Sequence, residues 1–381
     1  MSPKRGKRPA GRRVTVHIGL PKTGTTFLQA SLGQNQEAFR GAGLLYPSGE
    51  GRMFLAALDV RGTYDGWGRT PEETVGSWLD LCGRAHAFAG DTLISHELLA
   101  AAPRDRIVQA MSHLAGLELH VVVTTRDLAR QAISEWQEGI KHGRRLSFAK
   151  FTTQVLAGDS ETQHAHRFRG SHDLPAVLER WACVVPPENL HVVTCPPPGA
   201  GTDVLWSRFC DAAGIDGTRF GPAGKQSSNA SLGVHEIDLL RRVNKALDHR
   251  LAQPAYGKVV KEYFAQELLA RRTSPRPSLP MELYPDLAGI GERWVKEIDA
   301  AGYRVHGDLA DLVAAPPEIP SQHPDVVDRE AQVAAAAAVA AELLVELAGT
   351  REEIDRLTAE SAALAKKRKH LRRKLRAAKQ G

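Results

Sequence analysis

The residues whose types and spacing most clearly point to chemistry lie in one short segment, Ile18–Phe27 (IGLPKTGTTF). An apolar run at residues 14–18 predicts a strand before it, and the spacing of residues 25–40 predicts a helix after it. A loop in this position directs backbone N–H groups and the positive end of the helix toward one spot, which suits an anion. Gly24 allows a phosphate to approach, and Thr25 and Thr26 can donate hydroxyl hydrogen bonds.

This loop differs from the loop that binds nucleoside triphosphates, which has the form GxxxxGK[ST]. Gly19 and Gly24 have the required separation, and Thr26 occupies the Ser/Thr position. Thr25, however, stands where the lysine belongs, and Lys22 lies inside the loop. A kinase built on this loop would therefore lack the lysine that reaches the β- and γ-phosphates. The segment therefore suits a 5′-phosphate better than a triphosphate with magnesium.

The same loop resembles the 5′-phosphosulfate loop of sulfotransferases that use 3′-phosphoadenosine-5′-phosphosulfate (PAPS), including bacterial-type members. The family pattern is P-K-[ST]-G-[ST]-[ST], and residues 21–26 (PKTGTT) match it at every position. The resemblance implies a set of cofactor-binding residues: Pro21, Lys22, Thr23, Gly24, Thr25 and Thr26.

The resemblance extends to a second phosphate contact and covers about residues 14–145. The family binds the 3′-phosphate with an arginine that ends a central strand and a serine about eight residues later. Arg126 follows the apolar run Val121–Thr125, and Ser134 lies eight residues further. A clear counterpart of the family's R-K-G segment is not seen, and its candidate replacements are weak: Lys225, Gln226, Asn229 and Lys258.

Sulfuryl transfer needs a cation for the leaving oxygen, a base for the acceptor proton and in-line geometry. Lys22 is the natural cation. Cytosolic members carry a catalytic histidine after the strand that corresponds to residues 91–95, and His96 matches that place, with Glu97 beside it. Other branches use a glutamate base. We favour His96, because a pKa near neutrality suits proton abstraction, and we leave Glu97 open. Metal is not required.

The net charge of +6 is unevenly distributed. Residues 1–13 carry six Lys or Arg and no acid, and residues 366–381 carry nine and no acid, which leaves −9 for residues 14–365. The four cysteines show no CxxC spacing, so neither a disulfide framework nor a zinc site is indicated. We expect a cytoplasmic protein, with peripheral membrane contact through its basic end.

Predicted strands alternate with predicted helices, which is typical of an α/β fold. We expect strands at residues 91–95, 117–125 and 190–194, and helices near 74–89, 127–142 and 232–251. The predicted organisation is a disordered basic arm (1–13), a P-loop-like sulfotransferase domain with a parallel sheet flanked by helices (14–313), a Pro-rich linker (314–328) and a long basic helix (329–381). An imperfect heptad pattern in that last helix is typical of a coiled coil.

These observations predict a PAPS-dependent sulfotransferase that releases PAP, the 3′,5′-bisphosphate product. The acceptor is a hydroxyl or amine on a small molecule, glycan or lipid. Two alternatives remain: a P-loop nucleotide kinase, and a non-catalytic coiled-coil scaffold with a vestigial phosphate site. Partners expected for the last helix are a second copy of the chain or an anionic membrane surface. Specific nucleic-acid binding is not indicated.

Overall fold

The computed structural model describes residues 11–49, 51–64, 67–156, 161–224, 231–318 and 322–378. Most of the expected basic arm, part of the expected linker, and Lys225, Gln226 and Asn229 lie outside these residues. The chain divides into two compact units, Met1–Val326 and Val327–Gly381, and each is described by itself.

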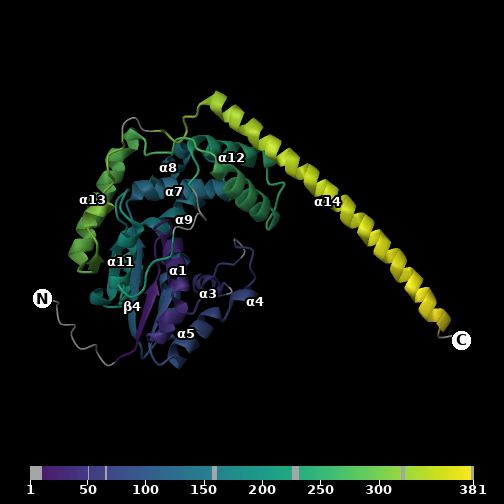
Figure 1. Ribbon diagram of the computed structural model, residues 1–381. Coiled ribbons are helices and arrows are strands. Elements are labelled where there is room, and N and C mark those ends of the chain that lie inside the picture. The colour runs from purple at the N-terminus through teal and green to yellow at the C-terminus, as the bar shows by residue number, and fades with distance from the viewer. Residues whose placement is uncertain are drawn as a thin grey trace. The chain divides into compact units, whose positions relative to one another are not determined.

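The first unit is built on a six-stranded parallel sheet, which confirms the expected α/β fold (Figure 1). The strand order is β2-β3-β1-β4-β5-β6. The strands are β1 (Arg13–His17), β2 (Leu44–Leu45), β3 (Asp91–Ser95), β4 (Glu118–Thr125), β5 (Leu190–Thr194) and β6 (Arg304–His306). Because β1 lies between β3 and β4, the segments that follow these three strands meet at one edge of the sheet. Ligands of open α/β sheets bind at that edge.

Helices cover the sheet and extend beyond its carboxyl edge. Val121, Val122 and Val123 of β4 are fully buried, as expected for a strand covered on both faces. In Figure 1, α7, α8 and α12 gather at one end of the sheet, away from α3, α4 and α5. The α-helices of this unit are α1 (Thr25–Gln34), α2 (Gln36–Gly41), α3 (Arg52–Arg61), α4 (Pro71–Thr74), α5 (Ser77–Ala87), α6 (Arg104–Ser112), α7 (Leu128–Lys141), α8 (Phe148–Leu156), α9 (Gln163–His172), α10 (Leu174–Trp181), α11 (Thr202–Ala213), α12 (Val234–Leu247) and α13 (Tyr284–Ala301).

Shorter helical turns complete the unit. They are η2 (Glu97–Ala101), η3 (Pro187–Asn189), η5 (Leu269–Arg271), η6 (Met281–Leu283), η7 (Leu309–Leu312) and the π-helix η4 (Gly257–Leu268). Two expected helices are each divided in the structure. The helix expected over residues 25–40 is interrupted at Asn35, and the helix expected over 74–89 becomes α4 and α5. The edge strands β2 and β6 were not expected.

Three histidines form a row across β4, β5 and β6 on the described part of the sheet. His120 Nδ1 lies 3.0 Å from His191 Nε2, and His191 Nδ1 lies 3.0 Å from His306 Nε2. His120 Nε2 also lies 3.1 Å from the Glu118 carboxylate, which can only accept when ionised. His120 Nε2–H therefore donates to Glu118, so His191 must donate to His120 and His306 to His191. The row is satisfied when all three imidazoles are neutral.

The second unit consists chiefly of one helix, α14 (Arg329–Ala378). Its heptad-spaced apolar side chains are exposed: Leu343, Leu347, Ile354, Leu357, Leu364, Leu371 and Leu375. An 18-residue window of this helix reaches a mean hydropathy of 1.7, so the helix is long and apolar enough to cross a membrane. Length and composition alone make this weak evidence for a membrane span.

Candidate active site

The loop between β1 and α1 is shaped by three residues with left-handed backbone. Gly19 has φ 27°, Gly24 has φ 82°, and Lys22 has φ 67° although it is not glycine. A Cβ on Gly24 would lie 2.6 Å from Leu205 Cδ2, so a larger residue here would require the Leu205 side chain to shift. A non-glycine residue in this backbone region carries strain of order 1–3 kcal/mol, and such strain is concentrated at functional sites.

The carbonyl and N–H groups of this loop face different surroundings. Three carbonyls accept hydrogen bonds from the protein: Pro21 O from Gln131 Nε2 (3.1 Å), Lys22 O from Arg126 Nη1 (2.9 Å) and Thr23 O from Cys195 Sγ (3.1 Å). Among the described hydrogen bonds, none uses the backbone N–H groups of residues 22–26. Successive unpaired N–H groups at a helix start form an anion-binding concavity.

Thr23 has a structural role within this loop. It is buried, its hydroxyl donates to Leu20 O at 2.6 Å, and it lies 2.8 Å from the Thr124 hydroxyl. Thr124 in turn contacts His17 Nε2 at 3.1 Å, and His17 Nδ1 lies 2.8 Å from Ser95 Oγ. The Thr23 side chain thus ties the loop to the sheet. Of the six loop residues expected to bind cofactor, this one can offer only its backbone N–H.

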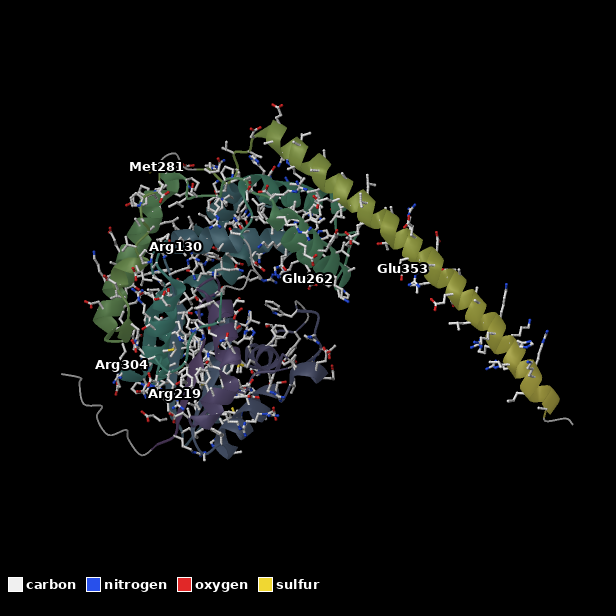
Figure 2. The ribbon with its side chains drawn as sticks, viewed as in Figure 1. Arg130, Arg219, Glu262, Met281, Arg304 and Glu353 are labelled. Carbon is white, nitrogen blue, oxygen red and sulfur yellow. The ribbon has the colours of Figure 1, made fainter. Side chains whose placement is uncertain are left out.

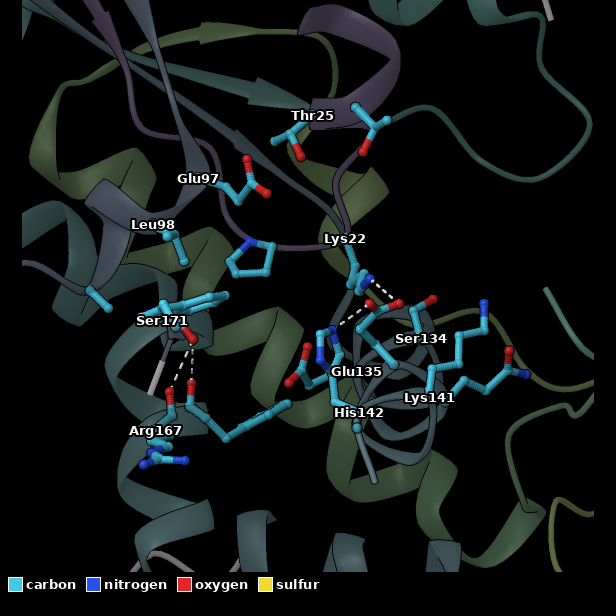
Figure 3. Close-up of a pocket in the computed structure, with 18 of the residues that line it drawn as sticks. Lys22, Thr25, Glu97, Leu98, Ser134, Glu135, Lys141, His142, Arg167 and Ser171 are labelled. Carbon is cyan, nitrogen blue, oxygen red and sulfur yellow. Dashed lines mark hydrogen bonds and ion pairs between the residues drawn. The ribbon is translucent and has the colours of Figure 1, made fainter. Parts of the chain in front are cut away.

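A cavity of about 2700 Å³ opens over the loop (Figure 3). It brings together most of the residues that the sequence singled out: Pro21, Lys22, Gly24, Thr25, Thr26, Glu97, Arg126 and Ser134. Thr23 and His96 do not line it, and Lys258 is exposed elsewhere. Residues from the ends of β1, β3 and β4 therefore share one cavity, as the strand order requires.

The cavity is cationic although the body of the chain is acidic. Its described lining holds nine Lys or Arg and three Glu, namely Glu97, Glu135 and Glu138. A cleft lined by one sign of charge concentrates ligands of the opposite sign. An anionic ligand is therefore favoured.

Arg126 and Ser134 both line this cavity and present unused donors. Arg126 Nε is buried without a hydrogen-bond partner in the described structure, and the Ser134 hydroxyl makes no described hydrogen bond. Burial, and then the charge of Arg130, lower the pKa of Arg126, so its charged form is penalised. A bound phosphate would remove that penalty, since guanidinium and phosphate form strong charge-assisted hydrogen bonds. The residue after β4 and one residue of α7 thus offer donors that suit an anion such as phosphate.

Lys22 is held by an acid that the sequence did not indicate. Its Nζ lies 2.9 Å from Glu138 Oε2, and Glu138 Oε1 also accepts from Lys261 at 3.0 Å and contacts His142 Nε2 at 3.0 Å (Figure 3). Burial raises the pKa of Glu138, but the His142 hydrogen bond and the two lysine charges lower it far below its usual value. Glu138 is therefore an anion that positions Lys22 at the loop.

The two candidate bases after β3 differ in their availability. His96 Nδ1 accepts the Leu98 N–H at 3.2 Å, so its lone pair is already used to begin η2. Burial lowers the pKa of His96, which further disfavours protonation. Glu97 lines the cavity, and Gln29 Nε2 donates to its Oε2 at 3.2 Å. The geometry therefore favours Glu97 over the histidine that the sequence favoured.

Comparison with known proteins finds a distant likeness in structure. No family model matches the sequence, and the search of curated proteins finds no match. One similar solved structure is that of a sulfotransferase from Alicyclobacillus acidocaldarius, with 14% identity and a TM-score of 0.38. The match covers 65% of this chain and 100% of that chain. A likeness at this level carries no argument about activity, which must rest on the residues of the site.

Proposed function

We propose that this protein is a sulfotransferase that moves a sulfuryl group from PAPS to an acceptor hydroxyl or amine and releases PAP. The observation that carries the proposal is one cavity lined by two groups of unused hydrogen-bond donors. The loop at residues 22–26 offers unpaired N–H groups for the 5′-phosphosulfate. Arg126 and Ser134 offer unused donors for a 3′-phosphate, which ATP does not have.

In the proposed reaction the acceptor oxygen or nitrogen attacks sulfur as the bond between sulfur and the bridging phosphate oxygen breaks. Negative charge grows on that oxygen, and Lys22 stabilises it as PAP leaves. Glu97 accepts the proton of the attacking group. Binding both partners in one cavity supplies the in-line geometry. Each role falls to a residue that lines the cavity.

Two alternatives make different predictions about ligand binding. A nucleotide kinase would bind ATP with magnesium, and a scaffold with a vestigial site would bind neither nucleotide. Titration calorimetry of the full chain with PAP, and separately with ATP and magnesium, decides among them. We expect PAP to bind much more tightly. Equal or tighter binding of ATP with magnesium would reject the proposal.

The 3′-phosphate contact can be isolated with one variant. We expect Arg126→Gln to weaken PAP binding by about 10- to 100-fold, because a charge-assisted hydrogen bond contributes about 1.5–3 kcal/mol. Adenosine 5′-phosphosulfate has no 3′-phosphate, so its affinity should change much less. Both affinities are measured by calorimetry. An equal loss for the two ligands would show that Arg126 supports the loop through the Lys22 carbonyl instead.

We further propose that α14 mediates association of the chain with a second copy. Its exposed apolar stripe has the spacing of a coiled-coil seam, although Thr350, Ser361 and Arg368 interrupt it. Truncation after Val326 should leave PAP binding intact. It should also reduce the number of chains per particle, measured by sedimentation equilibrium, from two to one. The basic end, residues 366–381, offers about 1 kcal/mol per charge toward an anionic membrane. If truncation abolishes binding to anionic vesicles without changing the number of chains per particle, the helix is assigned to a membrane surface.

We place the reaction in the cytoplasm. Cys82, Cys183, Cys195 and Cys210 are all free thiols, which suits a reducing compartment. The short thiol contact between Cys195 and the loop carbonyl of Thr23 would be lost on oxidation.

A further inference from the structure

Two arginines of the cavity have no part in the proposed reaction. Arg61 ends α3 and Arg167 lies on α9, and both line the cavity. In Figure 3, Arg167 appears on the side that carries Glu97, Leu98 and Ser171, whereas Ser134 and Lys141 appear on the opposite side. Arg167 thus lies toward the proposed base, and the charge of Arg61 acts on His96, the neighbour of Glu97.

Arg61 is more buried than a surface arginine and has no described acceptor. Its Nε is buried without a hydrogen-bond partner, and none of the described hydrogen bonds or ion pairs uses its guanidinium. It does not cap its own helix, because Arg106 takes the last carbonyls of α3, Asp59 O at 2.6 Å and Val60 O at 3.2 Å. Its position on the cavity is therefore not explained by the fold.

The environment of Arg61 is unfavourable for a cation in the unliganded protein. Burial, followed by the charge of Arg167, lowers the pKa of Arg61. The charge of Arg61 also reaches the base site, because burial and Arg61 lower the pKa of His96 while Glu97 opposes them. Three other cavity arginines differ in having acid partners: Arg69 with Glu73, Arg144 with Glu135 and Arg145 with Asp248.

We propose that Arg61 and Arg167 form an anion site for the acceptor, so that the acceptor carries a carboxylate, sulfate or phosphate besides its reacting hydroxyl or amine. This inference rests on the proposed sulfotransferase function. An anionic group between two guanidinium groups would satisfy their unused donors and offset their repulsion. It would also hold the acceptor beside Glu97, where its proton is removed. Trp67 and Tyr64, which line the same cavity, offer apolar surface to the rest of the acceptor.

The test uses the full chain saturated with PAP, so that the cofactor phosphate sites are filled. Titration calorimetry with inorganic sulfate at constant ionic strength should detect one further anion. Arg61→Gln and Arg167→Gln should each weaken sulfate by about tenfold or more while leaving PAP affinity unchanged. Arg69→Gln is the matched control, because Arg69 lines the cavity but already pairs with Glu73. It should bind sulfate as the unaltered protein does.

Several results would overturn the anion site. The first is that the PAP-saturated protein binds no sulfate. The second is that sulfate affinity is unchanged in both Arg61→Gln and Arg167→Gln. The third is that Arg69→Gln loses as much sulfate affinity as they do, which would indicate a general positive field in the cavity. Arg167 is exposed, so its variant remains informative if Arg61→Gln fails to fold. Failure of PAP to bind would reject the proposed function instead. The difference in sulfate affinity between Arg61→Gln and the unaltered protein would then still report on the anion site.

The chemistry of the anion follows from parallel titrations. Inorganic phosphate and malonate are added to the PAP-saturated protein under the same conditions as sulfate. Tighter sulfate or phosphate binding supports a sulfated or phosphorylated acceptor, and tighter malonate binding supports a carboxylated one. Either preference supports the anion site if the preference is lost in Arg61→Gln. A preference that persists in Arg61→Gln contradicts the anion site.

Discussion

Replacing Lys22 by alanine should slow sulfuryl transfer by roughly 10²–10³-fold, which is typical for loss of a group that stabilises transition-state charge. Lys22 is the loop cation nearest the expected leaving oxygen, and its Nζ is held at 2.9 Å from Glu138. The measurement is the rate of PAP release from labelled PAPS at saturating PAPS in the presence of a hydroxyl or amine acceptor. A turnover rate like that of the unaltered protein would remove Lys22 from the mechanism.

The variant should remain folded, for two reasons. Alanine adopts the left-handed backbone of residue 22 at about the same cost as lysine, so the strain is unchanged. Glu138 keeps His142 and Lys261 as partners, so no buried carboxylate is left unpaired. The melting temperature should therefore change little, and a large fall would mean that the kinetic loss reports on folding.

Lys261→Ala is the matched control. Lys261 also pairs with Glu138 and lines the same cavity, but it lies on η4 rather than in the phosphate loop. We expect its turnover to fall by less than about tenfold, since it removes general positive charge without removing the cation at the leaving oxygen. Equal losses in the two variants would indicate a shared electrostatic field instead of a specific role for Lys22.

The parts of the site that sequence could predict are those encoded by neighbouring residues. The loop at residues 21–26 follows a short apolar strand and precedes a helix, so both its position and its anion-binding character follow from local pattern. Arg126 and Ser134 follow a buried strand in the same way. The strand expected at residues 91–95 is β3, with the same bounds. Each of these features depends on chain geometry that a few consecutive residues set.

The parts that sequence missed depend on contacts between distant residues. Gln131 and Cys195 hold loop carbonyls from positions 110 and 172 residues away, and no local pattern marks either one. In the sequence, Glu138 is one polar residue of a predicted helix, and only the fold brings it into contact with Lys22. The preference for His96 relied on its ordinary pKa, but its Nδ1 accepts the Leu98 N–H and its ring is buried. β6 was missed because Arg304–His306 is short and only partly buried.

Stability should fall steeply as the pH drops below about 6.5, the ordinary pKa of histidine. Burial, and then the charge of His96, lower the pKa of His17 to about 3. Burial, followed by the charges of Arg13 and the neighbouring histidines, lowers the pKa of His191 to about 3. Both groups are neutral in the folded protein and bind protons in the unfolded chain between these pH values. Their contribution is thus fully present above pH 6.5 and is lost as the pH falls toward 3.

Each such histidine should contribute a slope of about 1.4 kcal/mol per pH unit to the free energy of unfolding in this window. Urea unfolding at pH 7.5, 6.5, 5.5 and 4.5 measures the slope. His191→Gln should lower stability at pH 7.5, because it disturbs the row with His120 and His306, yet flatten the acid slope, because glutamine cannot be protonated. His113→Gln, at an exposed position, is the control for loss of a histidine. An unchanged slope in His191→Gln would mean that the row already holds a proton in the folded protein, which burial and the charge of Arg13 oppose.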